Sequence, residues 1–107
     1  MQMPQTIEDY FEADGRNDRD AVLQCFGPDA VVNDEGHSSA GQDAIGTWWD
    51  DTKAKYHHTA EPIEATTRGH GTRVKARVTG DFAGSPAMMT YAFTLSGDKI
   101  AALEFGA

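Results

Sequence analysis

The sequence contains a single cysteine, Cys25, and little positive charge, with nine Lys and Arg against 17 Asp and Glu and a formal net charge of −8. One cysteine cannot form an internal disulfide or a cysteine-rich metal cluster. The acidic excess disfavours nucleic acids and anionic membrane surfaces, because their phosphates would be repelled. We therefore expect neither a nucleic acid nor a membrane among the partners.

Long apolar runs are also missing, since the longest one is the four-residue segment Ile100–Leu103. A membrane-spanning helix needs about 20 apolar residues. The N-terminal segment lacks the basic start and apolar stretch of a secretion signal, so we expect a cytoplasmic location. The 107 residues are 39% hydrophobic and 9% aromatic, which is enough for one core, and we expect one domain over residues 1–107.

The first half of the chain has helical periodicity. It predicts one helix over residues 4–14 and a third over residues 42–56, with a short second helix after Asp18 that ends at Gly27-Pro28. A short strand, residues 30–32, and a polar loop over residues 33–39 precede the third helix. The face of the first helix is apolar for two turns and then acidic. The residues at helical spacing are Ile7, Tyr10, Phe11 and Asp14 in the first helix, Val22, Cys25 and Phe26 in the second, and Ile45, Trp48, Trp49, Thr52 and Tyr56 in the third.

In the second half the hydrophobic period changes to two. It predicts strands near residues 63–68, 73–82, 87–95 and 100–105, joined by glycine-containing turns. The layout is α+β: three helices packed on a curved, mixed, mainly antiparallel sheet, forming a cone with a pocket at one end. Strand 87–95 carries no charge on either face, so we expect both its faces to be covered, one of them in a homodimer through the sheet.

Two acidic residues and a tyrosine are candidates for chemistry. Asp34 and Glu35 follow the predicted short strand, so at most one of them faces the interior, where a carboxylate becomes a usable general base. The alternative is a solvated loop acid. Tyr10 lies on the buried face of the first helix, with Asp14 one turn further on. It is either a core tyrosine or a hydrogen-bond donor aimed into a pocket.

Adjacent tryptophans and histidines give weaker signals. Trp48 and Trp49 diverge by about 100° on a helix, so we expect one in the core and the other at the cavity. The neighbouring His57 and His58 point to opposite faces of a strand, so they do not suit one metal ion, and no metal site is predicted.

Several segments resemble the nuclear transport factor 2-like superfamily, specifically its SnoaL-like branch. The segments that carry the resemblance are Tyr10-Phe11, residues 17–22, residues 26–34, Gly41-x-Asp43-Ala44-Ile45-x-x-Trp48-Trp49, residues 80–86 and residues 96–100. The resemblance spans nearly the whole chain and implies the same cone-shaped fold. It says less about function, because this fold serves isomerases, cyclases, dehydratases and non-enzymatic domains.

Residues 10–34 are also similar, without gaps, to bacterial ketosteroid isomerases. The similarity implies that Asp34 is the general base and Tyr10 an oxyanion donor. The second donor of that family, an aspartic acid, corresponds approximately to Tyr91 here, which is a departure from the family pattern. The expected pocket residues besides these three are Asp14, Trp48, Trp49, Met89 and Phe93.

Two functions follow from these signals. One is an isomerase-, cyclase- or dehydratase-type enzyme that uses Asp34 on a small apolar carbonyl compound and needs no cofactor. The other is a non-catalytic module that binds a small ligand or forms a dimer. An empty cavity beside Asp34 and Tyr10 favours the enzyme, whereas a cavity filled by Met88, Met89, Trp48 and Phe93 excludes it.

Overall fold

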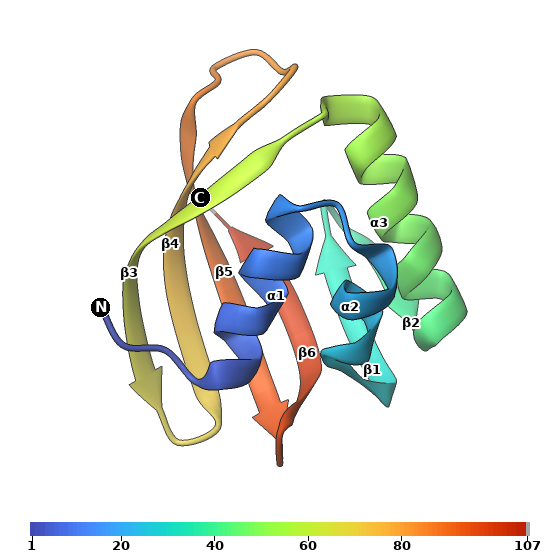
Figure 1. Cartoon of the computed structure of the whole chain (residues 1–107), viewed down its shortest axis with the longest axis vertical. Helices are drawn as coiled ribbons and strands as arrows, with labels where there is room; N and C mark the ends of the chain where they lie inside the picture. The colour runs from blue at the N-terminus through green and yellow to red at the C-terminus, as the bar shows by residue number, and fades with distance from the viewer. Residues whose placement is uncertain (107) are drawn as a thin grey trace.

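The computed structural model describes residues 1–106, in which three helices pack on a six-stranded sheet (Figure 1). The elements are α1 (Gln5–Gly15), α2 (Arg19–Gln24), β1 (Phe26–Asp34), β2 (His37–Ala40), α3 (Gln42–Tyr56), β3 (Thr59–Arg68), β4 (Gly71–Thr79), β5 (Ala87–Ser96) and β6 (Lys99–Gly106). The strand order is β2-β1-β6-β5-β4-β3, and only β1 and β6 run parallel. The predicted α+β class, with a mixed and mainly antiparallel sheet, is confirmed.

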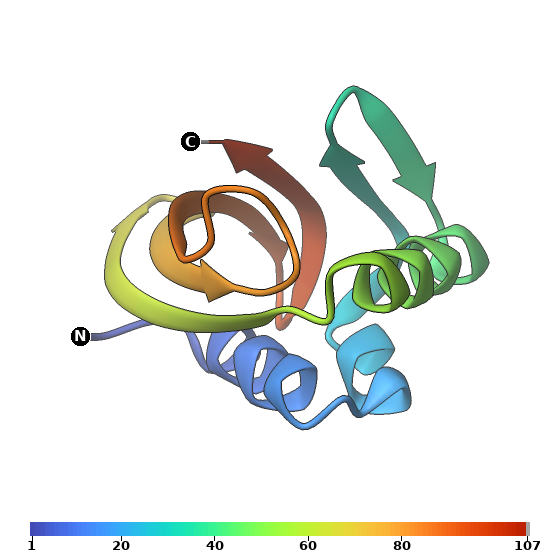
Figure 2. The same ribbon diagram turned by 90° about the horizontal axis from the view of Figure 1, so that it is seen from above.

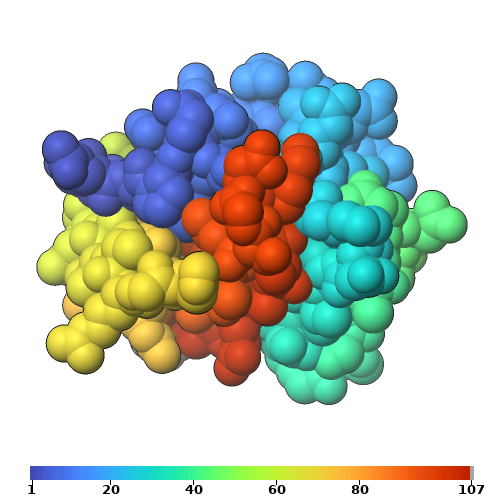
Figure 3. All heavy atoms as spheres, turned by 90° about the horizontal axis from the view of Figure 1, so that it is seen from below, coloured from blue at the N-terminus to red at the C-terminus, as the bar shows by residue number. Residues whose placement is uncertain are grey.

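The sheet is strongly curved, and its two ends differ. Seen from above, β3 to β6 curl round in an arc, while the hairpin of β1 and β2 extends away from them next to α3 (Figure 2). At the opposite end, the β5–β6 turn lies between α1 and β1 (Figure 3). Hydrogen bonds fix that turn: the Thr6 hydroxyl donates to the carbonyl of Asp98 at 2.7 Å, and the Lys99 ammonium donates to that of Gln24 at 2.6 Å.

The core lies between α1 and the concave face of the sheet. In β4, Thr72, Val74, Ala76 and Val78 are buried and alternate with exposed residues, as the period of two predicts. Edge-to-face contacts join Tyr10 of α1 to Phe93 of β5 and to Phe26 of β1. No helix within residues 1–106 combines the length and the apolar character that crossing a membrane would need.

The β1–β2 hairpin differs from the sequence-based prediction. Residues 33–39 were expected to be a loop, and Phe26 was assigned to the second helix, but β1 begins at Phe26 and pairs with β2. Glu35 and Gly36 form a two-residue turn with φ of 52° and 80°, the left-handed conformation that a tight hairpin requires. Pro28, expected to end a helix, instead lies where the β1–β6 register shifts, so no ladder hydrogen bond is lost.

The end of β4 also differs from its predicted boundary at residue 82. The strand stops at Thr79 because Gly80 passes close to the end of α3. A Cβ at Gly80 would lie 2.7 Å from the carbonyl oxygen of Tyr56 and 2.9 Å from the Cβ of His58. Phe82 therefore leaves the sheet and packs edge-on against Tyr56. This loop brings a further aromatic side chain to the open end of the cone.

Candidate functional site

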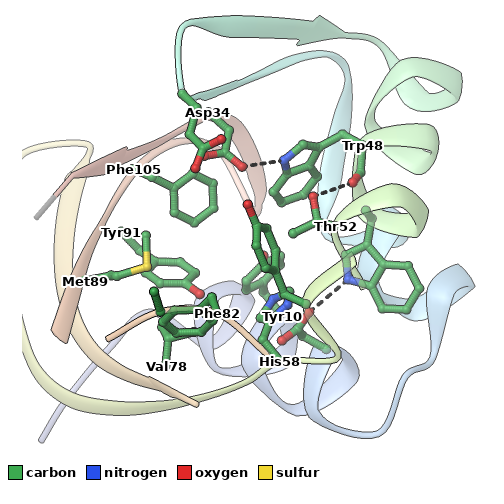
Figure 4. Close-up of a pocket in the computed structure, with 15 residues that line it drawn as sticks. Tyr10, Asp34, Trp48, Thr52, His58, Val78, Phe82, Met89, Tyr91 and Phe105 are labelled. Carbon is green, nitrogen blue, oxygen red and sulfur yellow. Dashed lines mark hydrogen bonds between the residues drawn. The ribbon is translucent and has the colours of Figure 1, made fainter. Parts of the chain in front are cut away.

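A cavity of about 300 Å³ opens between α1, α3 and the concave face of the sheet (Figure 4). This volume is at the small end of the range for ligand pockets, about 300–1,000 Å³. The cavity brings together seven of the eight predicted site residues, namely Tyr10, Asp14, Asp34, Trp48, Trp49, Met89 and Tyr91. Whether they act on a ligand stays a prediction.

Phe93 is the predicted residue that does not line the cavity. Its side chain is 1% exposed and packs against Tyr10 at 5.5 Å and against Phe11 at 5.9 Å between ring centroids. Although Phe93 shares the inward face of β5 with Met89 and Tyr91, it lies two residues further along the strand, under α1. The space is not filled by Met88 either, because that side chain is on the outer face and 48% exposed.

Asp34 holds its carboxylate at one end of the cavity through a single hydrogen bond. The indole Nε1–H of Trp48 donates to Oδ2 at 2.9 Å. Within residues 1–106, the second oxygen, Oδ1, has no hydrogen-bond partner. Glu35 lines the cavity as well, contrary to the expectation that only one of the two acids faces inward, because Glu35 belongs to the hairpin turn and not to the strand. Asp34 therefore combines a fixed orientation with a free acceptor oxygen.

Asp14 has a similar tryptophan partner but a different environment. The indole Nε1–H of Trp49 donates to its Oδ1 at 2.9 Å, and the ammonium of Lys53 lies 3.2 Å from the same atom. The side chains of this ion pair are only 4% and 12% exposed. Lys53 also donates to the carbonyl of His58 at 2.9 Å. Asp14 is thus neutralised by a structural network, which leaves Asp34 as the stronger candidate for a base.

Both tryptophans line the cavity, whereas we expected only one. The reason is that the cavity lies between α1 and β1, and each indole donates to a carboxylate from one of these elements. Trp49 is 7% exposed and Trp48 is half-buried. Trp48 forms an aromatic wall of the cavity together with Phe105 and Tyr91. The ring centroids of Trp48 and Phe105 are 5.7 Å apart, and those of Phe105 and Tyr91 are 4.6 Å apart.

The phenols of Tyr10 and Tyr91 are available as hydrogen-bond donors. Burial raises the pKa of Tyr10 well above its usual value, and the neighbouring Asp14 carboxylate raises it further. Burial and the same carboxylate also raise the pKa of Tyr91. Both phenols therefore stay protonated at neutral pH. Within the described part of the chain, neither hydroxyl hydrogen-bonds to another protein group.

Sequence reasoning missed several lining residues. Thr52 and Tyr56 lie on the same predicted helix face as Trp48 and Trp49, so helical spacing could have identified them as lining residues. His58 was set aside as half of a poor metal pair, on the assumption that both histidines lie in a strand. They instead lie between α3 and β3, and His58 lines the cavity. Nothing in the local sequence pattern placed Phe82 and Phe105 at the cavity, because it forms only when the loop after β4 and strand β6 come together. Among residues 1–106, no three His, Cys, Asp or Glu side chains are grouped to hold a metal ion.

Comparison with known proteins places this architecture in a family. The SnoaL-like domain profile matches residues 7–103. A provisionally named polyketide cyclase from Sinorhizobium meliloti is 44% identical with a TM-score of 0.95, over 97% of this chain and 95% of that one. No curated protein matches the sequence significantly.

More distant structures share the fold alone. A protein with a ketosteroid isomerase-like fold from Catenulispora acidiphila, in complex with trimethylamine, is 18% identical with a TM-score of 0.86, over 99% of this chain and 87% of that one. A computationally designed 17-OHP binder is 17% identical with a TM-score of 0.83, over 100% of this chain and 92% of that one. With the family profile covering most of the chain, the protein belongs to the SnoaL-like domain family.

Proposed function

We propose that the protein is a proton-transfer enzyme in which Asp34 acts as the general base on a small, largely apolar carbonyl compound. The observation that carries this proposal is the placement of a carboxylate with one free oxygen in the same aromatic cavity as two protonated, unpartnered phenols. A base and hydrogen-bond donors within one cavity are the groups that enolisation requires. The 44% identical relative, named as a provisional polyketide cyclase, is consistent with chemistry that starts from an enolate.

In the proposed reaction, Oδ1 of Asp34 takes a proton from the carbon next to the carbonyl group. The C–H electron pair forms a carbon–carbon double bond, and the carbonyl π pair moves onto oxygen. Tyr10, with Tyr91 as the second candidate, donates a hydrogen bond to this oxyanion and keeps its own proton. The resulting enolate can be reprotonated at another carbon, attack a second carbonyl or expel a leaving group. None of these steps needs a cofactor.

The charge of the lining narrows the substrate class. Asp14, Asp34 and Glu35 line the cavity, and no Lys or Arg is among the lining residues within 1–106. Because Lys53 compensates the charge of Asp14, the carboxylates of Asp34 and Glu35 leave the lining negative. An anionic ligand would be repelled at this lining. We therefore infer that the substrate is an uncharged ketone or polyketone, and not a carboxylate or a phosphate ester.

Hydrogen exchange tests this function without knowledge of the natural substrate. We expect the protein to accelerate deuterium uptake at the α-carbons of small cyclic ketones in D₂O, measured by proton NMR on 2-tetralone, 1-indanone and cyclohexanone. Tyr10→Phe should slow the exchange about 10²-fold, the usual effect of removing one oxyanion donor. Its fold should persist, because the Tyr10 hydroxyl has no protein partner to lose. Exchange no faster than in buffer for all three ketones would refute the proposal.

The alternative is a non-catalytic ligand-binding module, which the aromatic side chains of the lining favour. A designed 17-OHP binder has a similar fold, so the architecture accommodates a ligand without catalysis. The same ketones separate the two functions. A binding module would bind these ketones, and the bound ketone would quench the fluorescence of Trp48 and Trp49. It would not accelerate the exchange of their α-hydrogens.

We also infer a homodimer through the outer face of the sheet. On this face Met88 is 48% exposed, and its register partner Arg77 forms an ion pair with Glu61 at 3.1 Å. Sedimentation equilibrium should give about twice the chain mass of 11.6 kDa at micromolar concentration. Met88→Asp should lower that mass, because a charge in an interface of about 1,200–2,000 Å² is costly to bury. A wild-type monomer at high micromolar concentration would contradict the inference.

A further inference from the structure

His58 is a cavity residue to which the proposed reaction assigns no role. It follows His57, which ends α3 in the left-handed conformation with φ of 47°. This turn places His57 outside, with its Nδ1 3.0 Å from the Asp81 carboxylate, and His58 inside. Figure 4 shows His58 and Asp34 at opposite ends of the cavity.

The two nitrogens of the His58 ring are in different environments. Nδ1 is the buried side-chain atom that lacks a hydrogen-bond partner within residues 1–106. A proton on Nδ1 would be a buried N–H without an acceptor, which costs more than an unpaired lone pair. The neutral ring therefore carries its proton on Nε2, the nitrogen left to face the cavity.

Neighbouring groups keep the ring neutral. The ammonium of Lys53 donates to the backbone carbonyl of His58 at 2.9 Å, so a positive charge already lies beside the residue. Burial, followed by this charge, lowers the pKa of His58, although the carboxylates of Asp14 and Asp34 act in the opposite direction. The imidazole is thus uncharged at neutral pH and can donate through Nε2–H only.

We propose that His58 is a catalytic residue, a neutral imidazole whose Nε2–H donates a hydrogen bond to the substrate oxygen that becomes negative when Asp34 removes the proton. This inference rests on the proposed function. The C–H bond breaks, an O–H bond forms on Asp34, and the carbonyl π pair moves to the oxygen. The imidazole proton stays on Nε2 throughout, so no imidazolate forms. His58 and Tyr10 then share the oxyanion, and the substrate extends between the two ends of the cavity.

Three substitutions separate this role from a structural one. A glutamine side chain places its amide N–H near the position of Nε2, an asparagine places it near Nδ1, and phenylalanine keeps the ring without a donor. For 2-tetralone exchange, we expect His58→Gln to keep kcat within about tenfold of wild type. His58→Asn and His58→Phe should lower kcat about 10²-fold, as for the loss of one oxyanion donor, with KM changed less. Equal kcat values for the Gln, Asn and Phe variants would overturn the proposal.

A second measurement does not depend on catalysis. Long-range ¹H–¹⁵N NMR of the wild-type protein at pH 7 should show His58 with a protonated Nε2 and an unprotonated Nδ1. Adding 2-naphthol, whose oxygen resembles an enolate oxygen, to the Asp34→Asn protein should shift the Nε2–H resonance downfield. A protonated Nδ1, or no shift at saturating 2-naphthol, would refute the role of His58. If these signals appear but no ketone exchanges, the proposed function fails while His58 remains a ligand donor.

Discussion

Replacing Asp34 by asparagine should reduce ketone α-hydrogen exchange by about 10²–10⁴-fold, the usual contribution of a general base. Asparagine retains the shape of the side chain, and its amide oxygen can still accept the Trp48 Nε1–H bond that Asp34 accepts at 2.9 Å. It lacks the free carboxylate oxygen that would take the proton. The change should therefore appear in kcat and not in ketone binding measured by tryptophan fluorescence.

The stability of this variant is part of the same prediction. Because the Trp48 hydrogen bond is kept and a charge is removed from an aromatic cavity, the free energy of unfolding should be unchanged within about 1 kcal/mol or slightly raised. Thermal melts and urea titrations at pH 7 measure it. A clear loss of stability would indicate that Asp34 is a structural acid, and would remove it as a candidate base.

Glu35→Gln is the matched control for Asp34→Asn. Glu35 is the next residue, also lines the cavity and carries the same charge, but it lies exposed in the hairpin turn. If the carboxylates act only through the electrostatic field of the cavity, the two variants should lose activity to a similar extent. If Asp34 is the base, Glu35→Gln should change exchange by less than tenfold. Similar large losses in both variants would contradict the assignment of the base to Asp34.

The local sequence pattern was sufficient to predict most of the fold. The helix predicted over residues 42–56 has the bounds of α3, because its apolar spacing is regular and it ends before the His57 turn. The hairpin of β1 and β2 was not predicted, since His37–Ala40 has no strand-forming residues and pairs only because Glu35 and Gly36 adopt positive φ. Glutamate rarely adopts a positive φ, so the residues at this position did not indicate a hairpin turn.

The candidate site was partly predictable for similar reasons. Tyr10, Trp48 and Trp49 could be assigned from helical spacing. Asp34 and Glu35 were candidates because they follow the predicted short strand, and only the family resemblance selected Asp34 as the base. The partners of the two aspartates could not be deduced, because they depend on how α3 is placed relative to β1 and α1. Only this placement pairs Trp48 with Asp34 and Trp49 with Asp14. Lys53 lies in the last turn of α3, where the helix dipole favours a cation. Its position in the sequence was therefore explained without the ion pair to Asp14.

Breaking the buried pair of Asp14 and Lys53 should destabilise the fold far more than the loss of an exposed ion pair. Asp14→Ala leaves the Lys53 ammonium and the Trp49 Nε1–H without the oxygen that lies 3.2 Å and 2.9 Å from them. Loss of one partner of a buried ion pair typically costs about 3–5 kcal/mol. Urea unfolding at pH 7 should show this loss as a lower midpoint with an unchanged m-value.

The exposed ion pair of Arg19 and Asp50 is the control for this experiment. Its atoms are as close, with Nε 2.9 Å from Oδ1, but its side chains are 44% and 49% exposed. Asp50→Ala should therefore cost less than about 1 kcal/mol. A loss of similar size in both variants would show that burial does not distinguish the two pairs.

The double variant Asp14→Leu/Lys53→Met tests whether the cost arises from an uncompensated charge. Replacing both members of a buried ion pair by apolar residues is often close to neutral, because no charge is then left desolvated. The double variant should thus be more stable than Lys53→Met alone, which leaves the Asp14 carboxylate with only the Trp49 hydrogen bond. If the losses in Asp14→Leu and Lys53→Met add up to the loss in the double variant, the two residues contribute independently, and the network would not be the anchor of α1 to α3 that its geometry indicates.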